Sequence, residues 1–253
     1  MKTIGSDFSQ SLIRPITCGL GIGAATFSLI LITELAFGFI RPLSFFGDWE
    51  IPSHCIGLMI QGLILCLGIA IGEEVLYRGY LYGYLKKEYG LLVGIILSSI
   101  VFSAVHAPDG NRTLLQLGNI VAIGILLALI SAYYKNIWAP VGFHWIWNLL
   151  EMYIFPVSAN SSEKGVLRFI PVSGQGIVGP ENDILTTVVI IVVSTVFVIK
   201  ILDEKVLEHT PLIKKGGFSI ILIWILAFTG IIGIPKLLEE TPYEIVTTSA
   251  DEL

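Results

Sequence analysis

The sequence predicts an all-α protein of the polytopic integral membrane class, a bundle of about seven transmembrane helices around a polar intramembrane cavity. Three observations lead to this prediction. Of the 253 residues, 54% are hydrophobic and only 14% are charged, whereas soluble domains carry roughly 25% charged residues. The mean hydropathy is +0.82. The apolar residues also gather into runs of about 20, the length that crosses a bilayer as a helix.

Each helix is expected where an apolar run lies between polar or turn-rich segments. The first run is too long for a secretory signal and no small-residue cleavage pattern follows it, so we expect an uncleaved span. RPLSFFGDWEIPS is expected to be a loop, and KKEYG, APDGNRT and YKN separate the runs that follow. The expected spans cover residues 15–40, 55–71 continuing to 90, 91–106, 114–134, 137–155, 184–201 and 218–234.

The chain is expected to form one membrane domain over residues 1–253. It shows no internal repeat, and its only long loop is the Gly/Ser/Pro-rich segment 156–183. Glycine pairs four residues apart, such as Gly19/Gly23 and Gly68/Gly72, are expected to allow close contact between helices.

The distribution of charge predicts the orientation and excludes one class of partner. With seven spans, the segments on the N-terminal side carry twice as many Lys and Arg residues as those on the other side. The positive-inside rule therefore predicts a cytoplasmic N-terminus, and we expect the cell membrane as the location. The net charge of −5 is spread along the chain without a basic stripe. We expect the lipid bilayer as a partner and no nucleic acid.

The segment GEEVLYRG, residues 72–79, places charged residues at the end of an apolar run. Glu74 and Arg78 are four residues apart, so they can form an ion pair on one helix face. Glu73 points about 100° away and has no basic residue three or four positions further on. A carboxylate left in an apolar setting needs a proton or a partner, and we expect the partner of Glu73 on another helix.

His106 is the expected partner of Glu73. Both residues lie about 16 positions from the turn at KKEYG, so an antiparallel hairpin brings them to one depth, roughly 25 Å from the turn. A carboxylate beside an imidazole can activate a water molecule. Phe102, one turn before His106, is expected to pack and not to react.

His144 and Asn148 share a face of the 137–155 helix and can donate hydrogen bonds to a developing oxyanion. Alternatively, Glu73, His106 and His144 form a two-histidine, one-carboxylate set of the kind that holds catalytic zinc. The spacing leaves both interpretations open. His144 lies only about 13 Å from the YKN turn, so either the KKEYG hairpin projects further or this helix starts deeper. Glu151 is expected near the outer interface.

Three motifs on successive apolar segments resemble those of the CPBP family of intramembrane proteases. EEVLYR matches an EExxxR pattern, FSAVH an FxxxH pattern and HWIWN an HxxxN pattern. The family includes CAAX prenyl endopeptidases and bacteriocin-processing or bacteriocin-immunity proteins. The resemblance covers roughly residues 55–153, the expected catalytic core.

The resemblance implies a role for each motif residue. Glu73 would be the water-activating base, assisted by His106, while His144 and Asn148 would stabilise the oxyanion. Glu74 and Arg78 would organise the site. The implied activity is hydrolysis of peptide bonds in a catalytic cavity within the membrane, with zinc as an open possibility for a cofactor.

The implied substrates are peptides or membrane-tethered proteins cleaved near a terminus. One alternative is a non-catalytic bacteriocin-immunity protein that binds its target without turnover. A less favoured alternative is a small transporter in which Glu73 and His106 relay protons. Transporters of that kind usually have duplicated halves, and the chain has none.

Overall fold

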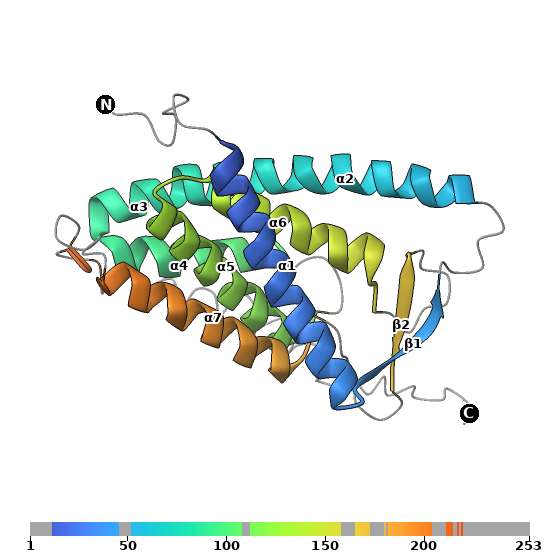
Figure 1. Ribbon diagram of the computed structural model, residues 1–253. Helices are drawn as coiled ribbons and strands as arrows, with labels where there is room; N and C mark the ends of the chain where they lie inside the picture. Colours follow the sequence, from blue (N-terminus) through green and yellow to red (C-terminus); the bar gives the residue numbers. More distant parts are fainter. Residues whose placement is uncertain are drawn as a thin grey trace, which may run out of the picture.

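The computed structural model describes residues 12–45, 52–107, 112–157, 165–172, 180, 182–203, 211–214, 217 and 219. Most of these residues form helices that run back and forth along a bundle (Figure 1). The elements are α1 (Ile13–Ala36), β1 (Ile40–Phe45), α2 (Pro52–Glu74), η1 (Val75–Leu81), α3 (Tyr82–Tyr89), α4 (Leu91–Ala104), α5 (Leu114–Tyr134), α6 (Trp138–Leu149), η2 (Leu150–Ile154), β2 (Leu167–Pro171) and α7 (Ile184–Asp203).

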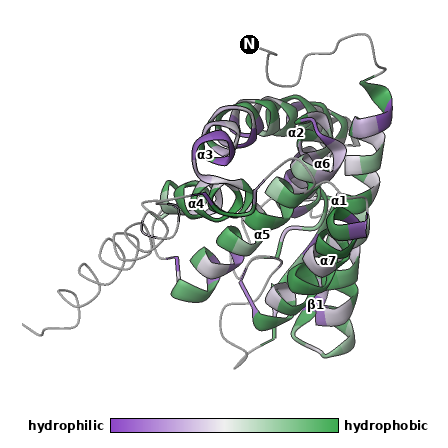
Figure 2. Ribbon diagram, turned by 90° about the vertical axis from the view of Figure 1, so that its left-hand side faces the viewer, coloured by the Kyte–Doolittle hydropathy of each residue, from purple (hydrophilic) through white to green (hydrophobic). Residues whose placement is uncertain are grey.

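Within the described residues, four helical segments are long and apolar enough to cross a membrane, so the expected number of seven is not confirmed. They are Ile13–Ala36, Ile56–Tyr89, Leu114–Tyr134 and Ile184–Asp203. The helices α4 and α6 have 14 and 12 residues, short of the roughly 17–25 that a span needs. The expected seventh span, 218–234, lies almost entirely outside the described residues. Figure 2 shows mainly hydrophobic residues along α1, α4 and α7 and hydrophilic ones at α3.

The helix α5 is the most buried of the four long apolar segments. It begins with a capping box, in which the Thr113 side chain accepts from the backbone N–H of Gln116 and the Gln116 side chain accepts from that of Thr113. It ends where Lys135 adopts a left-handed backbone conformation. The expected range 114–134 is confirmed because both signals lie in the sequence next to the helix.

The longest helical segment combines α2, η1 and α3, as the sequence predicts. The turn after it is made by Gly90, whose φ of +103° favours glycine. A Cβ atom at this position would also lie 2.7 Å from the carbonyl oxygen of Leu212. The hairpin of α3 and α4 is therefore held against residues 211–213.

The expectation that residues 41–53 form only a loop is wrong. Residues of β1 pair with β2 in an antiparallel two-stranded sheet, with Ile40 opposite Pro171 and Phe45 opposite Leu167. The sheet lies where α1 ends and α2 begins, at the right of Figure 1. The pairing joins segments more than 120 residues apart in the chain, which local patterns cannot reveal.

The helices α1 and α6 are in close contact through glycine. A Cβ atom on Gly19 would lie 1.9 Å from the carbonyl oxygen of Ala139, and one on Gly23 would lie 2.8 Å from that of Phe143. The expected close contact at Gly19 and Gly23 is confirmed. At Gly68 and Gly72 it is wrong, because an added Cβ would meet open space. The helix α1 thus supports the back of the helix that carries HWIWN.

Candidate active site

A buried ion pair lies at the junction of α2 and η1. The Nη1 atom of Arg78 donates to Oε1 of Glu74 at 2.8 Å, and both side chains are fully buried. The Nη2 atom donates to the carbonyl oxygen of Gly124 on α5 at 3.2 Å. The predicted pair is therefore present, and its cation also ties this junction to the central helix.

His144, on α6, contacts this ion pair. Its Nδ1 atom lies 3.0 Å from Oε1 of Glu74. An ionised carboxylate only accepts hydrogen bonds, so the hydrogen of this contact is on Nδ1. The other ring nitrogen, Nε2, lies 3.7 Å from Oε2 of Glu73. The imidazole thus lies between the two neighbouring glutamates and is oriented by Glu74.

The partner of Glu73 comes from another helix, as the sequence predicts. That partner is His144 on α6 and not the expected His106, which lines the same pocket. Arg78 balances the Glu74 carboxylate.

The two glutamates differ in their access to the pocket. The Glu74 side chain is 0% exposed, whereas that of Glu73 is 30% exposed. Only the Glu73 carboxylate can therefore meet a water molecule or a ligand directly. Its Oε2 atom is the one turned toward His144 and is itself buried, so the exposed part of the side chain is what an entering group can meet.

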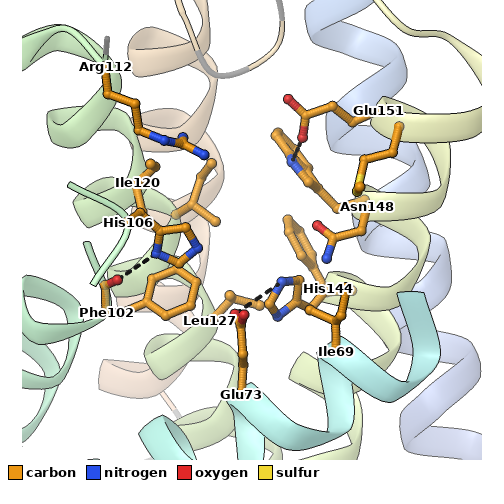
Figure 3. Close-up of a pocket in the computed structure, with 14 residues that line it drawn as sticks. Ile69, Glu73, Phe102, His106, Arg112, Ile120, Leu127, His144, Asn148 and Glu151 are labelled. Atoms are coloured by element: carbon orange, nitrogen blue, oxygen red, sulfur yellow. Dashed lines mark hydrogen bonds and ion pairs between the residues drawn. The ribbon is translucent and has the colours of Figure 1, made fainter. Parts of the chain in front are cut away.

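His106 lies just beyond the end of α4, and its Nδ1 atom donates to the carbonyl oxygen of Phe102 at 2.8 Å. In the neutral ring this leaves Nε2 as an acceptor, and Figure 3 shows that nitrogen directed into the pocket. The Phe102 ring packs as expected. Its neighbours are His106, at a centroid separation of 4.9 Å, and the Arg78 guanidinium at 4.5 Å.

One pocket of about 460 Å³ contains the four residues expected to react. Glu73 reaches it from α2, His106 from the end of α4, and His144 and Asn148 from α6 (Figure 3). The remaining lining residues are Ile69, Phe102, Arg112, Ile120, Ile123, Leu127, Phe143, Trp147, Glu151 and Met152. A mainly apolar wall therefore surrounds a small set of polar groups, as in most ligand sites.

Glu151 also lines this pocket, and its expected place near the outer interface stays a prediction. Its Oε2 atom accepts a hydrogen bond from Nε1 of Trp147 at 3.0 Å. Figure 3 shows Glu151 and Arg112 on opposite sides of the pocket, away from the Glu73 end. Glu151 lies three residues after Asn148 and seven after His144, which places all three on one helix face. This spacing could have identified Glu151 as a pocket residue.

The two helical hairpins extend to different lengths, and this difference explains how His144 lies at the same depth as Glu73. Glu73 lies 16 residues before Tyr89 and His144 nine residues after Lys135, yet the two side chains meet. At 1.5 Å per residue, the hairpin of α3 and α4 extends about 10 Å further than the α5–α6 turn.

Two of the three helices that carry the motifs, α2 and α6, change to π-helical geometry beside the site. The segment η1 begins directly after Glu74, and η2 begins two residues after Asn148. Such segments are rare and occur frequently at functional sites. Neither the motifs nor the apolar runs predict them.

Zinc binding by Glu73, His106 and His144 stays a prediction. Among the residues that the structure describes, no group of three or more His, Cys, Asp or Glu side chains is arranged to hold a metal ion. Nδ1 of His144 and Nδ1 of His106 each bond to protein oxygen atoms, which leaves the Nε2 atoms free and is also the usual arrangement of a metal-ligating histidine. Glu73, His106 and His144 share the pocket without forming a ligand set, so no catalytic step is assigned to a metal here.

Comparison with known proteins identifies one family. Residues 55–150 match the family described as type II CAAX prenyl endopeptidase, Rce1-like. The matched segment is less than half of the chain, but it includes all six motif residues from Glu73 to Asn148. No curated protein and no solved structure matches the chain.

Proposed function

We propose that this chain, an integral membrane protein whose residues 55–150 match the Rce1-like type II CAAX prenyl endopeptidase family, is an endopeptidase of the CPBP type that hydrolyses peptide bonds inside the membrane. The observation that supports this most strongly is the difference between its two glutamates. Glu74 is fully buried and bonded to Arg78, while Glu73 is accessible in a pocket with His106, His144 and Asn148.

Glu73 and His106 would activate the water. The Glu73 carboxylate would take a proton from a water molecule as the water oxygen attacks the carbonyl carbon of the peptide. The Nε2 atom of His106 would accept the second hydrogen of that water as a hydrogen bond, because Nδ1 already donates to Phe102. General base catalysis of this kind contributes typically 10²–10⁴-fold.

His144 and Asn148 would stabilise the tetrahedral intermediate. A proton on Nε2 of His144 and the amide hydrogens of Asn148 would donate to the oxyanion. When the intermediate collapses, the bond between carbon and nitrogen breaks, and the proton held by Glu73 goes to the leaving amine. The products are a carboxylic acid and an amine, so one water molecule is consumed in each cycle.

Glu74 and Arg78 would position His144 and would not touch the substrate. Glu74 holds Nδ1 of His144, and Arg78 fixes Glu74 while it is itself tied to Gly124. A buried carboxylate that orients an imidazole in this way also stabilises the ring when it becomes charged.

The proposed substrates are peptides or membrane-tethered proteins. The polar groups at the Glu73 end of the pocket are surrounded by aliphatic and aromatic side chains such as Ile69, Ile120 and Leu127. An apolar wall suits a substrate segment that reaches the site from the bilayer. A prenylated peptide ending in a CAAX sequence is the first substrate to test, because it is the class named for the family.

The test uses purified protein in lipid vesicles with a prenylated CAAX peptide and its unprenylated counterpart. We expect wild-type protein to cleave the prenylated peptide, and we expect Glu73→Gln and His106→Ala to lower the rate at least 100-fold with unchanged thermal unfolding. Rates in both variants that equal the wild-type rate would contradict the proposal and favour a binding function.

A further inference from the structure

A second cavity lies at the end of α5, and most of its lining comes from α1 and α7, which lie outside the family match. It has a volume of about 450 Å³ and lies between α1, the end of α5 and α7. Its lining residues are Ile22, Ala25, Thr26, Leu29, Tyr133, Tyr134, Val192, Val193, Val196, Phe197 and Lys200. We call this cavity the α1–α7 groove.

The groove is apolar along its length. Its only hydroxyl on α1 is that of Thr26, which donates to the carbonyl oxygen of Ile22 at 2.8 Å and so is satisfied within its own helix. The Phe197 ring is buried and packs edge-on against Tyr133, with centroids 5.7 Å apart. Val192 and Val196 are 57% and 47% exposed. The wall therefore offers open hydrocarbon surface over a packed floor.

Polar groups gather at one end of the groove. The Nζ atom of Lys200 lies 5.6 Å from the centroid of the Tyr133 ring. Tyr134 lies beside it and is close enough to Arg14 for an electrostatic interaction. Tyrosines at this position are typical of the headgroup level of a bilayer, and a lysine there can keep its ammonium in water while its stem lies on apolar surface.

The same end of the bundle is rich in positive charge. The ends of α3, α5 and α7 and the starts of α1, α4 and α6 lie there, because successive helices alternate in direction. The basic residues at this end are Arg14, Lys86, Lys87, Lys135, Lys200 and Lys214. Clusters of Lys and Arg next to a membrane attract anionic headgroups, by about fivefold in affinity for each charge.

The length of the groove fits one acyl chain. Val192 and Lys200 are eight residues apart on α7, which is about 12 Å along the helix. One leaflet of the hydrocarbon core is about 15 Å thick. An acyl chain that starts at Lys200 and runs toward Leu29 would therefore stay within its own leaflet.

We propose that the α1–α7 groove is a binding site for an anionic phospholipid, with the phosphate near Lys200 and Arg14 and one acyl chain between α1 and α7. The proposal does not depend on the protease activity, since none of the groove residues lines the catalytic pocket. A lipid held there would fill the space between α1 and α7. The helix α1 also packs against α6, which carries His144.

The test measures lipid binding to delipidated, detergent-purified protein by native mass spectrometry. The probes are phosphatidylglycerol and phosphatidylcholine with identical acyl chains. We expect wild-type protein to retain one phosphatidylglycerol at least tenfold more tightly than phosphatidylcholine. Lys200→Gln should reduce this preference about fivefold, while Arg41→Gln, which changes an exposed cation on β1 at the other end of the bundle, should not.

Two tryptophan variants of α7 test the groove itself. Val196→Trp fills it and should abolish retention of both lipids. Val198→Trp, two residues away and also exposed, lies outside the lining and should bind like wild type. Ala25→Phe gives a second block from the α1 side if Val196→Trp lowers the yield. Equal binding of the two lipids, or equal binding by the two tryptophan variants, would overturn the proposal. So would a wild-type dimer that Val196→Trp dissociates with no change in lipid retention.

Discussion

The Nδ1 atom of His144 lies 3.0 Å from Oε1 of Glu74, and this contact connects a fully buried ion pair to the accessible part of the pocket. It explains why two adjacent glutamates have different environments. Glu74 contacts Arg78 and His144 and is fully buried, whereas Glu73 lines the pocket. The roles that we propose for the motif residues follow from this difference.

Replacing Glu74 by glutamine should impair catalysis through His144. The amide would keep the shape of the side chain but lose the charge that fixes the imidazole and balances Arg78. In a comparable carboxylate–imidazole pair the same change lowers the rate about 10⁴-fold, and we expect a loss of at least 10²-fold in kcat. Glu88→Gln, at an exposed site on α3, is the matched control. A Glu74→Gln variant with wild-type kcat would contradict the positioning role.

Removing Arg78 alone should destabilise the protein, because it leaves Glu74 buried without its cation. Loss of one partner of a buried ion pair costs about 3–5 kcal/mol, so we expect Arg78→Leu to lower Tm by roughly 10 °C. The double variant Glu74→Leu/Arg78→Leu should have a higher Tm than Arg78→Leu but should remain inactive. Thermal unfolding in detergent measures the Tm of both variants. A double variant less stable than Arg78→Leu would show that the pair is not coupled.

The close contact of α1 with α6 should be sensitive to a single methyl group. A Cβ atom on Gly19 would lie 1.9 Å from the carbonyl oxygen of Ala139, but one on Gly21 would meet nothing within 4 Å. We therefore expect Gly19→Ala to lower Tm and activity, with a cost of about 1–3 kcal/mol, and Gly21→Ala to behave like wild type. If the two variants have the same Tm, the helices do not pack as described.

Chelation should leave the rate unchanged. Glu73, His106 and His144 do not form a metal-binding group within the described part of the chain. The measurement is peptide hydrolysis before and after dialysis against a chelator, with elemental analysis of the same sample. Activity that disappears with bound zinc and returns when zinc is added would reverse this assignment.

The sequence predicts the helices well where the signals are local. The ends of α5 follow from Thr113 and Gln116 at one end and the turn at Lys135 at the other. The sheet of β1 and β2 was missed because its pairing depends on distant segments. The count of seven spans rests on apolar composition alone, and α4 and α6 are apolar but short.

The candidate site was predictable in its residues but not in its contacts. Helix spacing predicted the pair of Glu74 and Arg78 directly. It could not show that His144 lies between both glutamates, because that contact depends on how far each hairpin extends. The bond from Arg78 to Gly124 and the π-helical segments are set by packing between helices, which no single segment encodes.

The most direct test of the account is a comparison of the membrane-associated peptides in cells that produce wild-type protein or Glu73→Gln at equal levels. The comparison can be made before any substrate has been identified, and Glu88→Gln serves as the control. We predict cleaved peptides in wild-type and Glu88→Gln cells that are absent from Glu73→Gln cells, together with accumulation of their uncleaved precursors. Identical peptide profiles in all three would contradict the claim that Glu73 activates water for peptide hydrolysis.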